Sequence, residues 1–390
     1  MRPSSNKTGA LAACSAKQPT EAEAASCAPV YMLLDDVLKL IFEDLCIHKL
    51  DNQDLGCIAP HHDPMPITHV SRRWRAVALA LPTIWRCIHL GRSRQLLQLW
   101  IERSAKLPIR VFGAEQERKQ WGLEEYFDQI RVVLRHAPRL QHFSFCSRQL
   151  SIVHSVCALL AKQDLPVLRT LVLRREGQWR RAADIQLPTC PNLTSLRLTD
   201  FMSYSHSFFS SQLPHLEALE LDKCGFLESS SLRKISETAP ALVKLTLKDL
   251  WYREEWAPGT TTFSNLWTLV LAFVGDCRTF TRSLELPSLQ TLVLHRSDGI
   301  LHSLADANAN THMLPLLKCL EVTALFQREE GYSELLHFLE KGASSVFPLK
   351  ELRLGQRLQE ELGVERLRLL GEYVAISTAE AYGEEYGSLF

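Results

Sequence analysis

The chain has 390 residues, and its 44 basic and 44 acidic side chains give a formal net charge of zero. This balance argues against a general nucleic-acid binder and against a protein held on membranes by a basic surface. Hydrophobic residues make up 46% of the sequence, so the chain can bury a large core, and its length suits a long repeat array preceded by a small module.

The first expected element is a disordered tail over residues 1–28, which are rich in Ala, Ser, Glu and Thr and have few large apolar side chains. From Leu33 to Leu45, apolar residues then recur every three or four positions. Asp35 and Asp36 suit the first turn of a helix, where the backbone dipole favours negative charge. We therefore predict a helix over residues 33–45.

A loop and a second helix are expected next. One glycine and three prolines predict a loop over residues 48–66. Residues 68–80 have apolar side chains on one face and arginines elsewhere, which predicts a single helix. Residues 84–90 then form an extended segment that leaves this helical module.

The remaining helices alternate with strands. The pattern predicts a helix over residues 93–105, a strand over 107–112 and a C-terminal capping helix over 360–376. Further helices are expected at residues 126–136, 151–161, 230–238 and 333–341, and polar or aromatic loops at 174–185 and 252–262.

One motif recurs from Leu140 to Leu354: leucine, two residues, leucine, one residue, leucine. The clearest copy is Leu193, Leu196 and Leu198. The nine copies, some of them loose, begin at Leu140, Leu168, Leu193, Leu216, Leu242, Leu266, Leu289, Leu317 and Leu349. Proline stands two places before the first leucine in seven copies, at Pro138, Pro166, Pro191, Pro214, Pro240, Pro287 and Pro315. The copies are mostly 23 to 28 residues apart, a spacing typical of leucine-rich repeats.

The motif has a physical explanation. Its last two leucines alternate with one residue, so they share one face of a short strand. Such a strand cannot bury that face alone, whereas stacked neighbours form a parallel sheet over a continuous core. Proline suits the position before a strand because it has no N–H donor and a fixed φ. The alternative interpretation is a series of ordinary buried strands in an α/β domain.

Residues 31–90 resemble an F-box. Leu33-Leu34-Asp35-Asp36-Val37-Leu38 with Ile41-Phe42 is similar to its opening helix, and Val70-Ser71-Arg72-Arg73-Trp74-Arg75 with Ala78 resembles its closing helix. Leu81-Pro82-Thr83-Ile84-Trp85 is similar to the segment that follows the F-box in the large fungal family of F-box proteins with leucine-rich repeats. The sequence has Leu34 where the family usually has proline, and Ser71 where it commonly has cysteine.

The resemblance implies a substrate-recognition subunit of an SCF-type cullin-RING ubiquitin ligase, in which the F-box packs against a Skp-type adaptor. The residues themselves also indicate a partner-binding face, because a module this small cannot bury so many large apolar side chains by itself. The alternative is that this apolar face packs on the first repeat. The positions that match the adaptor-binding face are Leu33, Leu34, Val37, Leu38, Ile41, Phe42, Val70 and Trp74.

The sequence contains no catalytic motif that we recognise: no glycine-rich phosphate loop, no GxSxG and no HExxH. We therefore expect no enzymatic activity and no cofactor, and an activity hidden in the irregular loops is the weakest alternative. Six residues of metal-ligand type lie within 24 positions, but they have no CxxC pair and no spacing known to us from zinc modules. We expect surface histidines rather than zinc at this cluster, which is Cys46, His48, Cys57, His61, His62 and His69.

The face of the sheet opposite the leucines is a second candidate site, because residues beside the strand leucines point away from the core. It mixes positive, negative and apolar positions, which favours a protein partner over a polyanion. The alternative is a plain solvated face. The candidate substrate-binding residues are Arg197, Glu220, Asp222, Lys244, Lys248, His295, Glu321 and Arg353. Trp251, Tyr252 and Trp256 are either partner anchors or repeat packing.

The 11 cysteines have no regular spacing, and several lie within apolar segments. We interpret them as reduced core thiols, as in cytosolic or nuclear proteins. No apolar run reaches the roughly 18 residues of a membrane span, and the N-terminus has no signal-peptide pattern. These features predict a cytoplasmic or nuclear protein.

Taken together, the patterns predict an α/β fold with a small all-helical F-box module over residues 29–90. A leucine-rich-repeat solenoid is expected over residues 91–376, with a parallel sheet on its concave face, and a tail over 377–390. The expected function is substrate recognition in a ubiquitin ligase, with a Skp-type adaptor, through it a cullin, and an unidentified protein substrate as partners. No nucleic-acid or membrane partner is expected. The alternative is a repeat scaffold without a ligase role.

Overall fold

The computed structural model describes most of the chain from residue 33 to residue 379. The described ranges are 33–48, 63–114, 123–176, 187–201, 212–227, 229–252, 261–274, 284–296, 299–302, 304, 314–325, 328–344 and 349–379. The tail predicted over residues 1–28 lies outside these ranges, as do residues 380–390 of the predicted C-terminal tail.

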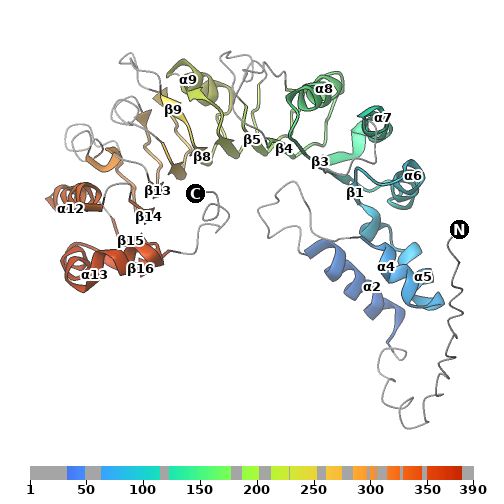
Figure 1. The fold of residues 1–390 in the computed structure, drawn as a ribbon, viewed down its shortest axis with the longest axis horizontal. Helices are drawn as coiled ribbons and strands as arrows, with labels where there is room; N and C mark the ends of the chain where they lie inside the picture. The colour runs from blue at the N-terminus through green and yellow to red at the C-terminus, as the bar shows by residue number, and fades with distance from the viewer. Residues whose placement is uncertain are drawn as a thin grey trace, which may run out of the picture.

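The fold is mixed α/β and is organised around one long sheet of 12 parallel strands. Neighbours in the sheet follow chain order, and β1 and β16 form its two edges, so the sheet is open. Its strands line the inner side of an arc, and most helices lie on the outer side (Figure 1). The strands are β1 (Cys87–His89), β2 (Ile109–Ala114), β3 (Leu140–Ser147), β4 (Thr170–Arg175), β5 (Ser195–Thr199), β6 (Ala218–Asp222), β8 (Lys244–Lys248), β11 (Thr268–Ala272), β13 (Thr291–His295), β14 (Cys319–Ala324), β15 (Glu351–Leu354) and β16 (Ala375–Thr378).

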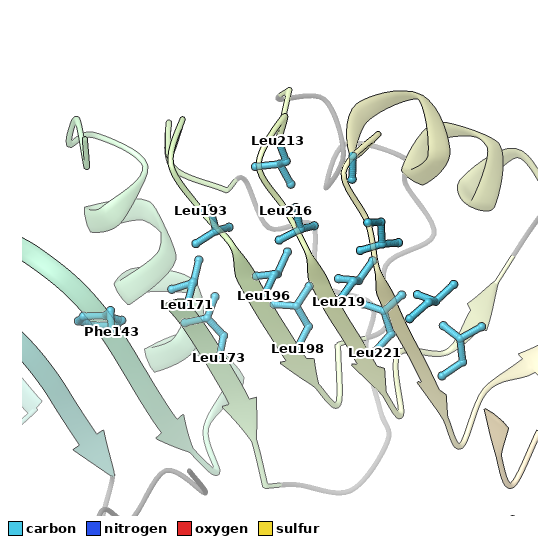
Figure 2. Packing of buried hydrophobic residues seen from close by; sticks show 14 of the residues in the cluster. Phe143, Leu171, Leu173, Leu193, Leu196, Leu198, Leu213, Leu216, Leu219 and Leu221 are labelled. Atoms are coloured by element: carbon cyan, nitrogen blue, oxygen red, sulfur yellow. The ribbon is translucent and has the colours of Figure 1, made fainter. Parts of the chain in front are cut away.

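Each of the nine leucine motifs supplies one strand of this sheet, from β3 to β15, so the predicted parallel sheet is confirmed. The motifs pair in register, with Leu196 opposite Leu219 and Leu219 opposite Leu245. Figure 2 shows the leucines of neighbouring strands stacked in rows on one side of the sheet. Those side chains are buried, and they belong to a hydrophobic core that runs from Leu38 to Val374.

The proline of the motif sits in a turn rather than directly before the strand, where we had placed it. In Leu213-Pro214-His215-Leu216 the Leu216 N–H donates to the Leu213 carbonyl at 3.1 Å, and β6 begins only at Ala218. Pro214 therefore occupies the second position of a four-residue turn, where its fixed φ is already suitable. Equivalent hydrogen bonds close the turns that contain Pro166, Pro191, Pro240, Pro287 and Pro315.

The helices follow the predicted order with shifted ends. On the outer side of the arc are α6 (Arg94–Arg103), α7 (Leu123–Leu134), α8 (Leu150–Leu160), α9 (Ser229–Thr238) and α12 (Arg328–Ser344) (Figure 1). The N-terminal part consists of α2 (Asp35–Glu43), a π-helical turn η2 (Asp44–His48), α4 (Met65–Val70), α5 (Arg72–Leu79) and a 3₁₀ turn η3 (Pro82–Trp85). A further 3₁₀ turn is η4 (Ala137–Arg139), and two short parallel pairs are β7 (Phe226–Leu227) with β9 (Trp251–Tyr252) and β10 (Thr261–Thr262) with β12 (Leu284–Glu285).

The prediction of a single helix over residues 68–80 is wrong, because the helix is interrupted at Ser71. Ser71 has extended backbone angles, φ −155° and ψ 167°, and its Oγ accepts a hydrogen bond from the Trp74 N–H at 3.1 Å. Serine is among the best residues for capping a helix N-terminus, so it starts α5 instead of continuing α4. Pro66, in the first turn of α4, is also compatible with a helix start.

The C-terminal prediction also requires correction. The helix α13 spans Gln356–Gly371, with a kink at Gly363, where φ is 74°. Residues 375–378 form β16 and pair with β15, although residues 375 and 376 were predicted to be helical and residues 377 and 378 to belong to the tail. The β-branched residues Ile376 and Thr378 favour a strand, and β16 supplies backbone partners for β15, which would otherwise be the edge of the sheet.

Five consecutive strands of the sheet end in the same backbone feature. The residue after each strand has a positive φ, in the left-handed region of backbone conformation. Its N–H donates to a carbonyl at the end of the next strand, and the distance from the Asp200 nitrogen to the Asp222 carbonyl oxygen is 2.7 Å. Left-handed backbone is unfavourable for residues other than glycine, so the surrounding ladder must hold it in place. This row of left-handed residues is Asp200, Lys223, Asp249, Phe273 and Arg296.

Candidate interaction site

The N-terminal helices are held together by one apolar contact and one polar one. Phe42 of α2 packs against Trp74 of α5, with ring centroids 5.1 Å apart. Arg73 of α5 pairs with Asp35 at 2.7 Å and also donates to the Leu33 carbonyl. These contacts fix α2 across α5, so that one side of α2 faces inward and the other faces outward.

Helix α2 has both buried and exposed apolar side chains. Its inward side carries Leu38 and Phe42, which are completely buried. Its outward side carries Leu34, 72% exposed, and Leu40, 66% exposed, with the partly exposed Val37 between them. The helix also carries the charged residues Asp35, Asp36, Lys39 and Glu43, so it is amphipathic, with exposed apolar side chains beside a charged face. Leu45 of η2 and Val70 of α4 are also exposed, and we call these exposed apolar side chains of the N-terminal helices together the outer apolar face: Leu34, Val37, Leu40, Leu45 and Val70.

The predicted adaptor-binding residues therefore divide into two groups. Leu34, Val37 and Val70 lie on the outer apolar face, and Leu33, Ile41 and Trp74 are half-buried. Leu38 and Phe42 lie inside the chain's own core, because the inward side of α2 packs on α5. The prediction missed Leu40 and Leu45. Leu40 lies three positions after the predicted Val37, a spacing that places the two side chains on neighbouring turns of the helix surface and could have identified it.

The N-terminal helices are joined to the sheet rather than separated from it. Trp85 is buried, and its Nε1 donates to the Ala78 carbonyl at 2.8 Å. Thr83 Oγ1 donates to Glu43 Oε1 at 2.7 Å, which ties η3 to α2. The strand β1 lies within the predicted module of residues 29–90, yet it pairs with β2 as the first strand of the sheet. The N-terminal helices are therefore attached to the first strands by buried contacts.

The predicted substrate-binding residues occupy adjacent strands, and several of them pair with each other. Arg197 Nε lies 2.7 Å from Glu220 Oε2, and Lys248 Nζ lies 2.9 Å from Glu220 Oε1. Asp222 is buried, whereas Lys244 is exposed. Internal pairing satisfies much of this charge, so Lys244 is the most accessible cation of the group.

The remaining candidates lie toward the C-terminal edge of the sheet. Arg353 Nη2 is 2.9 Å from Glu351 Oε2, and Ser377 Oγ donates to the other oxygen of Glu351 at 2.7 Å. Glu321 is half-buried opposite Arg353. The His295 Nδ1 lies 2.6 Å from Thr323 Oγ1. Trp256 and the side chains of Trp251 and Tyr252 lie outside the described residues.

Burial changes the acidity of several groups on this face, among them Asp222, His142 and His295. Desolvation raises the pKa of Asp222 to about 6, although Lys223 and Lys248 act in the opposite direction. Burial lowers the pKa of His142 to about 4, and the nearby Arg110 contributes to that shift. The ring centroids of His142 and Phe112 are 4.8 Å apart, so a protonated His142 imidazolium would be largely removed from water.

We expect His142 to make the protein sensitive to acid. Its folded pKa of about 4 lies below the unfolded value of 6.5, so its contribution to stability is complete above pH 6.5. That contribution is lost as the pH falls toward 4, by about 3 kcal/mol at most. Chemical denaturation at pH 7.5 and pH 4.5 should show a smaller difference for His142→Gln than for the wild type. The control is His215→Gln, at an exposed turn residue, and an unchanged difference in His142→Gln would contradict the assignment.

The structure identifies no metal centre in the described part of the chain. No group of three or more His, Cys, Asp or Glu residues there is arranged to hold a metal ion. Burial raises the pKa of the Cys46 thiol to about 12, which disfavours the thiolate form that binds metals. The possible zinc ligands Cys57, His61 and His62 lie outside the described residues. Of the helices that are described, none combines the length and apolar character that crossing a bilayer requires.

Comparison with known proteins gives no family for this chain. A scan against protein-family models finds no match, and a search of curated proteins finds no relative.

Proposed function

We propose that this protein is the substrate-recognition subunit of an SCF-type ubiquitin ligase. In this proposal the N-terminal helices are an F-box that docks on a Skp-type adaptor, and the long sheet belongs to a leucine-rich-repeat solenoid that captures a protein substrate. The adaptor would connect the chain to a cullin. The chain would contribute proximity between substrate and ligase rather than chemistry of its own, and it would act in the cytoplasm or nucleus.

The observation that carries the proposal is the outer apolar face. Leu34, at the N-cap of α2, and Leu40, within the helix, are both more than half exposed, whereas Leu38 and Phe42 of the same helix are fully buried. Leaving such side chains in water is unfavourable, by roughly 25 cal/mol for each Å² of apolar surface. An exposed helical face of this kind is typical of a docking surface for a partner protein.

A rigid connection to the sheet supports the receptor role. The buried Trp85 links α5 to the first strands, and Gln129 of α7 clamps the turn after β1. Its Oε1 accepts from the Gly91 N–H at 2.8 Å, and its Nε2 donates to the Arg92 carbonyl at 2.7 Å. A partner bound on the outer apolar face would therefore be held in a defined position relative to a protein bound along the arc (Figure 1).

Co-purification of the full chain with a Skp-type adaptor tests the proposal. The variant Leu34→Asp with Leu40→Asp should lose at least 90% of the bound adaptor, because a charge at each position cannot be buried without a partner. Both side chains are exposed, so the thermal unfolding midpoint should stay within about 2 °C of the wild type. Charged substitutions at Phe42 are unsuitable for this purpose, since that ring is in the core.

The matched control is Val364→Asp, which changes an apolar residue that is 86% exposed on α13 at the far end of the chain. It should retain the adaptor. Adaptor binding that survives Leu34→Asp with Leu40→Asp would exclude the outer apolar face as the docking site. A wild-type chain that binds no adaptor would favour the alternative of a scaffold without a ligase role.

A further inference from the structure

A pocket of about 270 Å³ opens near the C-terminal end of the sheet, at the ends of β13 and β14, which also carry the predicted substrate residues His295 and Glu321. It lies between the end of β14 and the first turns of α13. Two arginines and one glutamate reach it, and its remaining surface is largely aliphatic. The lining residues are Arg296, Thr323, Ala324, Leu325, Arg357, Leu358 and Glu361.

Arg296 differs from the other charged members of the row of left-handed residues. Asp200 pairs with Arg175 at 2.8 Å, and Lys223 lies 3.9 Å from Asp249. Arg296 has no carboxylate partner among the residues that the structure describes. Its guanidinium instead lies over the ring of Phe273, 5.5 Å from the centroid. The aromatic ring positions the cation without neutralising it.

The second arginine, Arg357, makes only a weak ion pair. Arg357 Nε lies 3.2 Å from Glu361 Oε1, but the Arg357 side chain is largely exposed. Surface ion pairs of this kind contribute little energy, so Arg357 can turn toward a stronger anion. Leu358 and Leu325 supply the apolar wall beside the two guanidinium groups.

We propose that this pocket binds an anionic group on an apolar stem, carried by a peptide: a carboxylate or a phosphate monoester. Guanidinium groups bind both anions through paired hydrogen bonds. The pocket is large enough for one side chain and its anion, and it is smaller than typical cofactor sites. That the ligand belongs to a peptide rests on the proposed receptor role, whereas anion binding by the pocket does not. The proposed adaptor site is at the other end of the chain, so each proposal can fail without the other.

Titration of the full chain with small probes, followed by calorimetry or ligand-observed NMR, tests the proposal. Phenyl phosphate and phenylacetate present the two anions on an aromatic stem, inorganic phosphate lacks the stem, and benzyl alcohol lacks the charge. At least one of the first two should bind more tightly than inorganic phosphate and benzyl alcohol. Tighter binding of phenyl phosphate assigns a phosphorylated side chain, and tighter binding of phenylacetate assigns a carboxylate.

Variants then locate the binding. Arg296→Gln should weaken it about tenfold, the effect of losing one charged hydrogen bond, and Glu361→Gln should strengthen it several-fold. The matched control, Arg353→Gln, removes an arginine from the inner face outside the pocket and should leave binding unchanged. Circular dichroism confirms that each variant is folded, with Arg296→Lys as a second variant at that position.

Three results would overturn the proposal. The first is the absence of binding by either aromatic anion. The second is equal weakening by Arg296→Gln and Arg353→Gln, which would show diffuse attraction to basic surface. The third is equal binding of benzyl alcohol, which would assign the pocket to apolar ligands.

Discussion

Asp200→Ala is expected to lower the free energy of unfolding by about 3–5 kcal/mol. Asp200 Oδ2 accepts a hydrogen bond from Arg175 Nε at 2.8 Å, and both side chains are at least 95% buried. Removing the carboxylate leaves a buried guanidinium without its counter-charge, which costs far more than the pair itself contributes. Urea denaturation followed by circular dichroism measures the loss.

Two further variants separate this effect from the loss of a charge as such. Asp128→Ala removes the carboxylate of a pair of similar length, 2.7 Å to Arg131, in which both side chains are about half exposed. It should cost less than about 1 kcal/mol. Arg175→Met with Asp200→Asn removes both charges, and asparagine tolerates the left-handed backbone at position 200. This double variant should recover most of the stability, and a double variant as unstable as Asp200→Ala would refute the explanation.

Trp85→Ala is expected to cost about 3–5 kcal/mol, as for other buried aromatic residues. The ring is 1% exposed, and its N–H bonds to the Ala78 carbonyl inside the core. Trp85 lies between α5 and β1, so the loss should extend to both sides of that junction. Hydrogen exchange should speed up in α5 and in β2 together.

The matched control is Trp267→Ala, at a tryptophan that is 55% exposed beside β11. It should change stability by less than about 1 kcal/mol. If hydrogen exchange in Trp85→Ala increases in α5 but not in β2, the N-terminal helices and the sheet are separate folding units. The rigid placement of the outer apolar face would then no longer hold.

The row of strands could be predicted from the sequence because it depends on local periodicity. The leucine spacing identified nine strands in the correct order, whereas the prolines mark turns four residues before most strand starts and not the starts themselves. The ends of helices and strands were harder to predict. The break at Ser71 depends on a capping hydrogen bond to Trp74, which competes with an otherwise continuous helical pattern. The strand β16 depends on a long-range pairing with β15.

The candidate sites also combine features that follow from the sequence with features that depend on long-range contacts. The sequence by itself determined that the N-terminal helices carry more apolar residues than they can bury, because composition and spacing are properties of the chain alone. Only the tertiary structure decided that Phe42 lies inside and Leu40 outside, because that choice depends on which side of α2 packs against Trp74. The pairing of Arg197 with Glu220 and the stacking of Arg296 on Phe273, without a carboxylate partner among the described residues, were likewise decided by neighbouring strands, which bring together residues that are more than 20 positions apart in the sequence.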